Sequence, residues 1–478
     1  MSSKENPGNP GPAPDAGFPK LFYAARKAIQ AHATGGNLLI VATILALACA
    51  NIVPINEYYN DFWNQPVRLQ IGDFNVFSHS GEPMNLLGFI NDALMAIFFF
   101  SIGLEIKREV LVGELSSFRQ ALLPIIGACG GMIVPVCLFF LDAYGTDYAN
   151  GAAIPMATDI AFSLGVLTML GKRVPISLKI FLTTLAVADD IGGIIVIAVF
   201  YSSHLELGFL LLSLFFLFIL ALGGYVMKIQ SKAFYFFFGA IVWFLFLNSG
   251  IHPTIAGVIV AFTVPAQPVF APKKYIGVIQ KAMSHFQNQT EEEKRMLDRT
   301  ILTPVQMNWL KEVESASDKV ISPLQELEDN LNPLVNYFII PLFAFANAGI
   351  TLLGMDPLSA FEGISLAVIL GLFFGKFIGI FSFSWLTIKL GLAPMPARSN
   401  WPMMASVSML GGIGFTVSIF IATLSFVGGG HQADLLNHAK LGIVLGSIFS
   451  GIVGYIMLHK TLPKVSELSD DEMVEDED

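Results

Sequence analysis

Residues 182–200 read LTTLAVADDIGGIIVIAVF, an apolar run in which two adjacent aspartates, Asp189 and Asp190, lie near the middle. A helix needs about 20 apolar residues to cross a hydrocarbon layer roughly 30 Å thick, and this run nearly supplies them by itself. An ionisable side chain at such depth costs roughly 2.5–3.5 kcal/mol on insertion scales, so an acid placed there marks a functional site by default. The stretch therefore predicts a membrane-spanning helix that carries a pair of carboxylates.

The rest of the chain shares this apolar character. Of its 478 residues, 54% are hydrophobic and 13% are charged, whereas soluble proteins carry about 25% charged residues. This composition excludes a soluble enzyme, a secreted disulfide scaffold and a nucleic-acid-binding protein. We predict an all-α polytopic membrane protein with twelve transmembrane helices, near residues 38–54, 86–104, 120–141, 152–170, 176–201, 207–227, 233–248, 251–270, 333–353, 364–388, 402–427 and 439–459.

The lysines and arginines predict the orientation of these spans, because cytoplasmic loops of inner-membrane proteins are enriched in them. With the N-terminus inside, all but three of the 27 basic residues fall in cytoplasmic segments, the exceptions being Arg68, Lys376 and Lys440. We therefore expect a multi-pass protein of the cell inner membrane with both termini in the cytoplasm.

The twelve-span domain is predicted to cover residues 19–460; two segments of different character flank it, and two lie within it as long loops. Residues 1–18 are predicted to be a disordered cytoplasmic leader, and residues 461–478 an acidic cytoplasmic tail that accounts for most of the formal net charge of -10. The external loop 55–85 contains the partly alternating string VRLQIGDFNVF, which predicts a small β-hairpin. The long cytoplasmic loop 271–330 contains charged, amphipathic helical stretches.

Two spans are expected to be interrupted. Residues 154–170, IPMATDIAFSLGVLTML, hold Thr158 and Asp159, and residues 403–420, MMASVSMLGGIGFTVSIF, hold a run of glycines. Irregular backbone in a membrane is tolerated only where protein or a water-filled cavity surrounds it, which predicts that Thr158 and Asp159 lie beside an ion path. Close helix packing through small residues is the alternative explanation of the glycines. Because the interrupted spans take matching places in spans 3–5 and 10–12, we also predict inverted repeats.

Lys376 is the only base within a predicted span, and it requires an acidic partner. The aspartates of the fourth and fifth spans, Asp159, Asp189 and Asp190, are the candidates. A purely structural buried ion pair is the alternative to a functional one. Adjacent residues project about 100° apart on a helix, so one carboxylate of the Asp189–Asp190 pair can face an ion cavity while the other faces a neighbouring helix.

Several strings together identify the chain as similar to a known family. FINDALMAIFFFSIGLEIKRE, AIPMATDIAFSLGVL, VPISLKIFL, VADDIGGIIVIAVFY, NSGIHPTIAGVIV, PLFAFANAGITL and GLFFGKFIGI closely resemble the NhaA-type sodium/proton antiporters of bacterial inner membranes. The resemblance covers roughly residues 20–460. It implies secondary active exchange of Na⁺ or Li⁺ for H⁺, for pH and sodium homeostasis, by a lipid-embedded protein that uses no cofactor and is not an enzyme.

The resemblance also implies residue roles. Asp190 is expected to be the principal ligand of the cation and the proton, while Asp189 assists and pairs with Lys376 in the ion-free state. Thr158 and Asp159 are expected at the crossing of the two interrupted helices, where Asp159 would offset positive helix ends and Lys376 negative ones. The hairpin of loop 55–85 would join two protomers into a homodimer.

Acids of the second span and of the stretch before the ninth complete the expected site. Glu105 and Glu109, at the cytoplasmic end of the second span, are expected to line the cytoplasmic entrance and to contribute to the pH response with Glu328, while Asp92 is expected to be a structural intramembrane acid. Relatives carry Glu-His-x-x-His-Pro in the stretch where residues 328–333 here read EDNLNP, so a histidine-based contribution to pH sensing is not expected.

Two other classes of function compete with this prediction. A sodium-coupled symporter of an organic anion has a similar architecture, but it needs a roomy site with polar groups that the strongly apolar spans do not offer. An intramembrane aspartyl protease also uses two aspartates, but its G-x-G-D signature is absent from the sequence.

Overall fold

The computed structural model describes residues 35–463 except for positions 72–73, 76, 80–81, 203–204, 269–274, 278, 282–283, 285–303, 353–357 and 359–360. The predicted leader, all but the first residues of the predicted tail and much of the predicted cytoplasmic loop lie outside the described residues.

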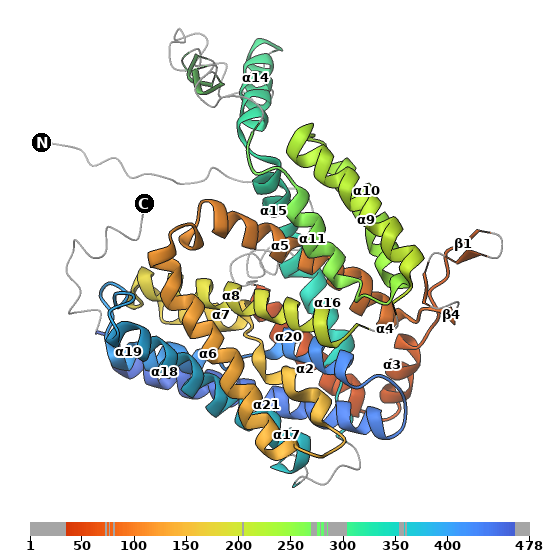
Figure 1. Ribbon diagram of the computed structural model, residues 1–478, viewed down its shortest axis with the longest axis vertical. Helices are drawn as coiled ribbons and strands as arrows, with labels where there is room; N and C mark the ends of the chain where they lie inside the picture. The colour runs from red at the N-terminus through yellow and green to blue at the C-terminus, as the bar shows by residue number, and fades with distance from the viewer. Residues whose placement is uncertain are drawn as a thin grey trace, which may run out of the picture.

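Long apolar helices make up most of the described chain (Figure 1). Eight of them have the length and composition of membrane spans. They are α4–η1–α5 (Leu86–Phe89, Ile90–Leu94 and Met95–Leu111), α6 (Phe118–Ala143), η3–α7 (Ala149–Met156 and Ile160–Met169), α8 (Ile176–Phe200), α9–η5 (Leu207–Ala221 and Leu222–Val226), α10 (Lys232–Ser249), α17–η8–α18 (Gly363–Leu370, Gly371–Gly375 and Lys376–Lys389) and α21 (His431–Thr461).

Two bent helix pairs raise the number of candidate spans among the described residues to as many as ten. α2 (Gly35–Asn51) and α3 (Ile55–Trp63) meet at 114°, and α19 (Trp401–Leu410) and α20 (Phe415–Ser425) meet at 43°. The chain is therefore an all-α, multi-pass membrane protein. The remaining helices are η2 (Glu114–Ser116), η4 (Gly171–Arg173), α11 (Thr254–Thr263), α14 (Pro304–Val320), α15 (Pro323–Leu334), η6 (Val335–Ile339) and α16 (Ile340–Asn347).

The loop that follows α2 begins with a helix rather than with extended chain. Tyr59 and Trp63 of α3 are buried, and both rings pack edge-on against Phe345 of α16 with centroids 5.7 Å apart. Beyond α3, four two-residue strands form two antiparallel pairs at the right of Figure 1: β1 (Gln70–Ile71) with β2 (Phe74–Asn75), and β3 (Ser78–His79) with β4 (Glu82–Pro83).

Glycines bring α6 and α18 into very close contact. A Cβ atom on Gly130 would lie 2.3 Å from the carbonyl oxygen of Gly379, and one on Gly379 would lie 2.1 Å from that of Gly130. Without a hydrophobic force between helices in lipid, small residues at the interface allow this approach. The contact places Lys376, the first residue of α18, against α6.

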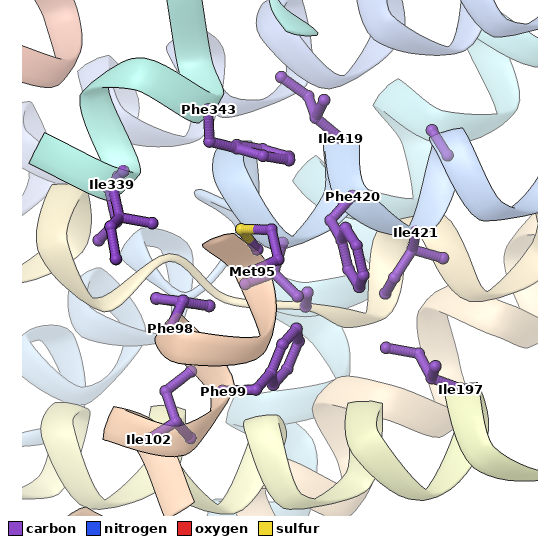
Figure 2. Close-up of a cluster of buried hydrophobic side chains, with 14 of the residues drawn as sticks. Met95, Phe98, Phe99, Ile102, Ile197, Ile339, Phe343, Ile419, Phe420 and Ile421 are labelled. Carbon is purple, nitrogen blue, oxygen red and sulfur yellow. The ribbon is translucent and has the colours of Figure 1, made fainter. Parts of the chain in front are cut away.

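The main hydrophobic cluster extends through much of the helical bundle, and Figure 2 shows the part in which α5 meets α8, η6, α16 and α20. The rings of Phe99 on α5 and Phe420 on α20 have centroids 5.5 Å apart, and Phe343 on α16 lies 6.3 Å from Phe420. Ile197 of α8 belongs to the same cluster. These contacts hold the second half of the interrupted pair α19–α20 against α5 and α16.

Candidate functional site

The two interruptions predicted from the sequence lie against each other. Residues 157–159 separate η3 from α7, and residues 411–414 separate α19 from α20. The Asp159 N–H donates a hydrogen bond of 2.6 Å to the carbonyl of Ile413, and the Thr158 hydroxyl lies 2.8 Å from the carbonyl of Gly411. Backbone groups that the broken helices leave unpaired are thus satisfied across the crossing.

The Asp159 carboxylate accepts hydrogen bonds from the first turns of two helices. Its donors are the Phe162 N–H of α7 (3.1 Å), the Thr416 N–H of α20 (3.0 Å) and the Thr416 hydroxyl (2.6 Å). A helix N-terminus carries a partial positive charge and free N–H groups, so a carboxylate there is stabilised. Asp159 is 3% exposed, and its charge is therefore balanced by the two helix ends that meet around it.

Lys376 makes its contacts with Asp189 and Thr158. Its ammonium group is 0% exposed and contacts the Asp189 carboxylate, and it donates a hydrogen bond of 3.0 Å to the Thr158 hydroxyl. That hydroxyl lies 2.6 Å from the same Asp189 oxygen, Oδ2. A hydroxyl has one proton to donate, so at any moment Thr158 can donate a full hydrogen bond either to Asp189 or to the carbonyl of Gly411.

The second oxygen of Asp189 has no hydrogen-bond partner in the part of the chain that the structure describes. Its Oδ1 atom is buried, and no described residue forms a hydrogen bond with it. Asp190, which is 6% exposed, likewise receives no hydrogen bond from the described residues. Carboxylate oxygens buried without donors are costly as bare anions. The pair therefore offers oxygen atoms that a proton or a small cation can occupy.

A second charged group lies at the C-terminal end of α5, formed by Arg108, Glu109 and Glu328 and called here the Arg108 cluster. The Arg108 guanidinium donates to Glu328 at 2.6 Å and to Glu109 at 3.0 Å. Burial raises the pKa of Glu328 to about 7, and the neighbouring carboxylates support this shift while Arg108 opposes it. Glu328, in α15, thus changes charge near neutral pH.

Glu105 and Asp92 lie on the same long helix as Arg108, outside this cluster. Glu105 is half-buried one turn nearer the helix centre and forms no hydrogen bond with a described residue. Asp92 lies in η1, roughly 20 Å from Glu105 along the axis. Its carboxylate is 3.7 Å from the His252 ring, and its backbone carbonyl accepts a hydrogen bond of 3.1 Å from Trp243.

The family model described as Na+/H+ antiporter 1 matches residues 26–458. The chain belongs to this family. The family assignment and the buried carboxylates agree, because both point to cation chemistry inside the membrane.

Curated relatives extend over nearly the whole chain. The Na(+)/H(+) antiporter NhaA of Phocaeicola vulgatus is 52% identical over 444 residues, which cover 93% of this chain and 97% of the relative. The antiporter of the same name from Parabacteroides distasonis is 53% identical over 89% of this chain and 93% of its own. Na(+)/H(+) antiporter NhaA 1 of Saccharophagus degradans is 41% identical over 95% of both. These comparisons give no support to an organic-anion symporter.

Within this family member, the structure brings together Thr158, Asp189 and Lys376, which lie far apart in the sequence, and places Asp190 beside them. Asp159 lies at the same crossing. Glu109 and Glu328 meet through Arg108, whereas Glu105 and Asp92 join neither group. Among the described residues, no three His, Cys, Asp or Glu side chains gather closely enough to hold a metal ion.

Sequence reasoning missed two residues of this architecture. Thr416 supplies two of the hydrogen bonds to Asp159. Its position at a helix start, shortly after a run of glycines, could have indicated such a role. Lys107, expected in a cytoplasmic segment, is instead buried in α5 and donates to the carbonyls of Phe262 (2.6 Å) and Val264 at the C-terminal end of α11. A cation at that end balances the negative pole of a short helix.

Proposed function

We propose that the chain is a secondary active antiporter that exchanges Na⁺, and also Li⁺, for H⁺ at the Asp189–Asp190 pair. Family membership supports the reaction. The site is supported by the buried, unpartnered Oδ1 of Asp189 and by the adjacent buried carboxylate of Asp190, which receives no hydrogen bond from the described residues. A transported ion bound there draws its other ligands from hydroxyls, backbone carbonyls or water. Asp190 carries the ion and the proton, while Asp189 assists.

Competition between the proton and the cation couples their fluxes. Both need the same carboxylate oxygens, so binding of one displaces the other, and the coupling needs no further energy source. Lys376 keeps Asp189 satisfied while the site is empty of cation. When a cation binds, Asp189 turns from Lys376 toward the ion, and the Thr158 hydroxyl is free to donate to Gly411.

Twelve spans in two inverted units would give this site alternating access. The ten candidate spans together with α11 and with η6–α16, which follows α15, give twelve. Spans three to five are then α6, η3–α7 and α8, and spans ten to twelve are α17–η8–α18, α19–α20 and α21. In both units the middle span is the interrupted one, as expected for transporters built from inverted repeats.

We further propose that both termini lie in the cytoplasm and that the protein is in the inner membrane. The Arg108 cluster then lies at the cytoplasmic end of α5, where Glu328, Glu109 and Glu105 modulate the response to pH. The paired strands that follow α3 would join two protomers into a homodimer.

Everted vesicles test this function directly. With no organic substrate present, added Na⁺ or Li⁺ should dissipate a pH gradient in wild-type vesicles, and the apparent Michaelis constant for Na⁺ should rise as pH falls while the maximal rate changes much less. Asp190→Asn should abolish exchange although the protein still inserts, because an amide cannot carry the titrating charge. Near-normal exchange by Asp190→Asn would refute the site, and a maximal rate that collapses at low pH despite saturating Na⁺ would refute simple competition.

A further inference from the structure

An apolar cavity of about 840 Å³ opens between α6 and α8. Its walls include Val136 and Phe140 of α6 and Ile195 and Phe200 of α8, and residues of η3 close it from within. We call it the α6–α8 groove. Several of its lining residues, among them Ala152, Ala153 and Met156, also belong to the main hydrophobic cluster, of which Figure 2 shows the part around α5, α16 and α20.

The inner end of the groove approaches the ion site without offering an ion path. Gly192, which lines the groove, follows Asp189 by three residues, or about 4.5 Å along the helix. The side chain of Met132 covers this glycine, since a Cβ atom on Gly192 would lie 2.0 Å from the Met132 sulfur. The lining residues include no charged side chain. An apolar surface of this kind suits a hydrocarbon occupant rather than a hydrated cation.

The mouth of the groove faces the bilayer. α6 and α8 are both membrane-spanning helices, and apolar side chains at the opening are strongly exposed: Ile133 is 54%, Ile195 57% and Phe200 74% exposed. In a spanning segment, such side chains meet acyl chains rather than water. A lipid tail is therefore the molecule available to fill the groove.

One end of the groove is polar, and the exposed Asp142 lies on α6 two residues beyond the lining residue Phe140. The Tyr201 hydroxyl donates to the carbonyl of Asn150 at 3.1 Å and lies 2.9 Å from the Ser425 hydroxyl, and all three residues line the groove. Asp142, near the end of α6, accepts a hydrogen bond of 3.0 Å from Tyr148, two residues before Asn150. Tyrosines of this kind gather at membrane interfaces, and the exposed carboxylate attracts a cationic head group.

We propose that the α6–α8 groove binds one acyl chain of a phospholipid with a primary ammonium head group, of the phosphatidylethanolamine class. The tail lies between α6 and α8 with its end toward Gly192, and the ammonium group lies near Asp142. The proposal does not depend on which ion the protein transports.

Photolabelling tests the tail. The purified full-length protein is reconstituted in phosphatidylethanolamine vesicles with a trace of the same lipid carrying a diazirine near the tail end, and labelled peptides are mapped by mass spectrometry. Labels should fall on groove residues of α6 and α8. Ile195→Trp should lower this labelling about tenfold, the effect of roughly two methylene groups losing their contacts, and Cys137→Trp on the opposite wall should do the same.

Ile448→Trp is the matched control, because Ile448 is an exposed apolar residue of α21, outside the groove. It should leave groove labelling unchanged. Equal groove labelling in the wild type, Ile195→Trp and Cys137→Trp would overturn the proposal. So would protein–protein cross-links at the groove in place of lipid adducts, since they would show a second copy as the occupant.

A second measurement tests the head group. Diazirine lipids with phosphatidylglycerol head groups should label the wild-type groove about fivefold less than the ethanolamine probe, and Asp142→Lys should reverse this preference. Asp61→Lys, which introduces the same charge change at an exposed site on α3, should not reverse it. Equal labelling of the wild type by the two probes would overturn the assigned head group.

Discussion

The Lys376–Asp189 pair and the Arg108–Glu328 pair join the same kinds of charge in different surroundings. The first has both side chains 0% exposed, whereas in the second the arginine side chain is 36% exposed and the glutamate 4%. Removing one partner from a fully buried pair leaves an uncompensated charge with no water to solvate it. A pair that water reaches on one side loses little and can respond to bulk pH. This difference supports the proposal that the first pair takes part in ion binding and that the second modulates it.

The largest effect on stability should come from breaking the buried pair. Lys376→Ala leaves Asp189 without its partner and should lower the free energy of unfolding in detergent by about 3–5 kcal/mol, seen as a fall in Tm. The double variant Lys376→Ala with Asp189→Asn removes the orphaned charge and should recover part of that loss. If the losses of the two single variants simply add in the double variant, the two residues do not act as a pair.

A smaller loss is expected at the helix crossing. Thr416→Val keeps the shape of the side chain but removes a hydroxyl hydrogen bond to the buried Asp159 carboxylate, which should cost about 1.5–3 kcal/mol. Thr423→Val is the matched control, because among the described residues the Thr423 hydroxyl on the same helix bonds only the carbonyl of Phe420. Equal Tm values for the two variants would show that the Thr416 hydroxyl does not stabilise the Asp159 carboxylate.

The smallest effect should be a change in pH dependence at the Arg108 cluster. The pKa of Glu328 is raised from 4.5 to about 7, so between these values the folded protein binds the proton more tightly than the unfolded chain. This group therefore lowers the free energy of unfolding as pH rises from about 4.5 to about 7 and adds no further change above that. Glu328→Gln should flatten the stability profile in this window and shift the pH midpoint of exchange by less than about one unit.

Glu326→Gln provides the control for that measurement. Glu326 lies two residues away on α15 and contacts Lys232 of α10, and its side chain is 34% exposed. The Glu326→Gln variant should leave the pH profiles of stability and of exchange unchanged. Identical pH profiles for the wild type and Glu328→Gln would remove Glu328 from the pH response.

The buried charges could be predicted from the sequence, because an ionisable side chain within an apolar span is costly to insert and is therefore kept only where it has a role. Their partners could not all be found in this way. Lys376 and Asp189 are 187 residues apart, and the residues alone left three aspartates as candidates until the family resemblance favoured one. The interruptions near Thr158 and in the glycine run of residues 411–414 were visible as polar or flexible residues within apolar stretches.

Interactions that depend on how the helices pack against one another could not be predicted from the sequence. Asp159 caps α20 only because the two breaks cross, and Lys107 reaches the end of α11 only because that helix is short and packs on α5. Likewise, the residues that follow α2 form α3 because Tyr59 and Trp63 can pack on Phe345, a contact that local sequence does not encode.

Na⁺-induced proton release from the purified protein tests the central claim most directly. In a weakly buffered detergent solution, adding Na⁺ should release protons from the wild type in a saturable manner, because the cation takes the oxygens that held them. Asp190→Asn should release none above a K⁺ control. Undiminished release from Asp190→Asn would show that the exchanged proton does not come from the Asp189–Asp190 pair and would contradict the account.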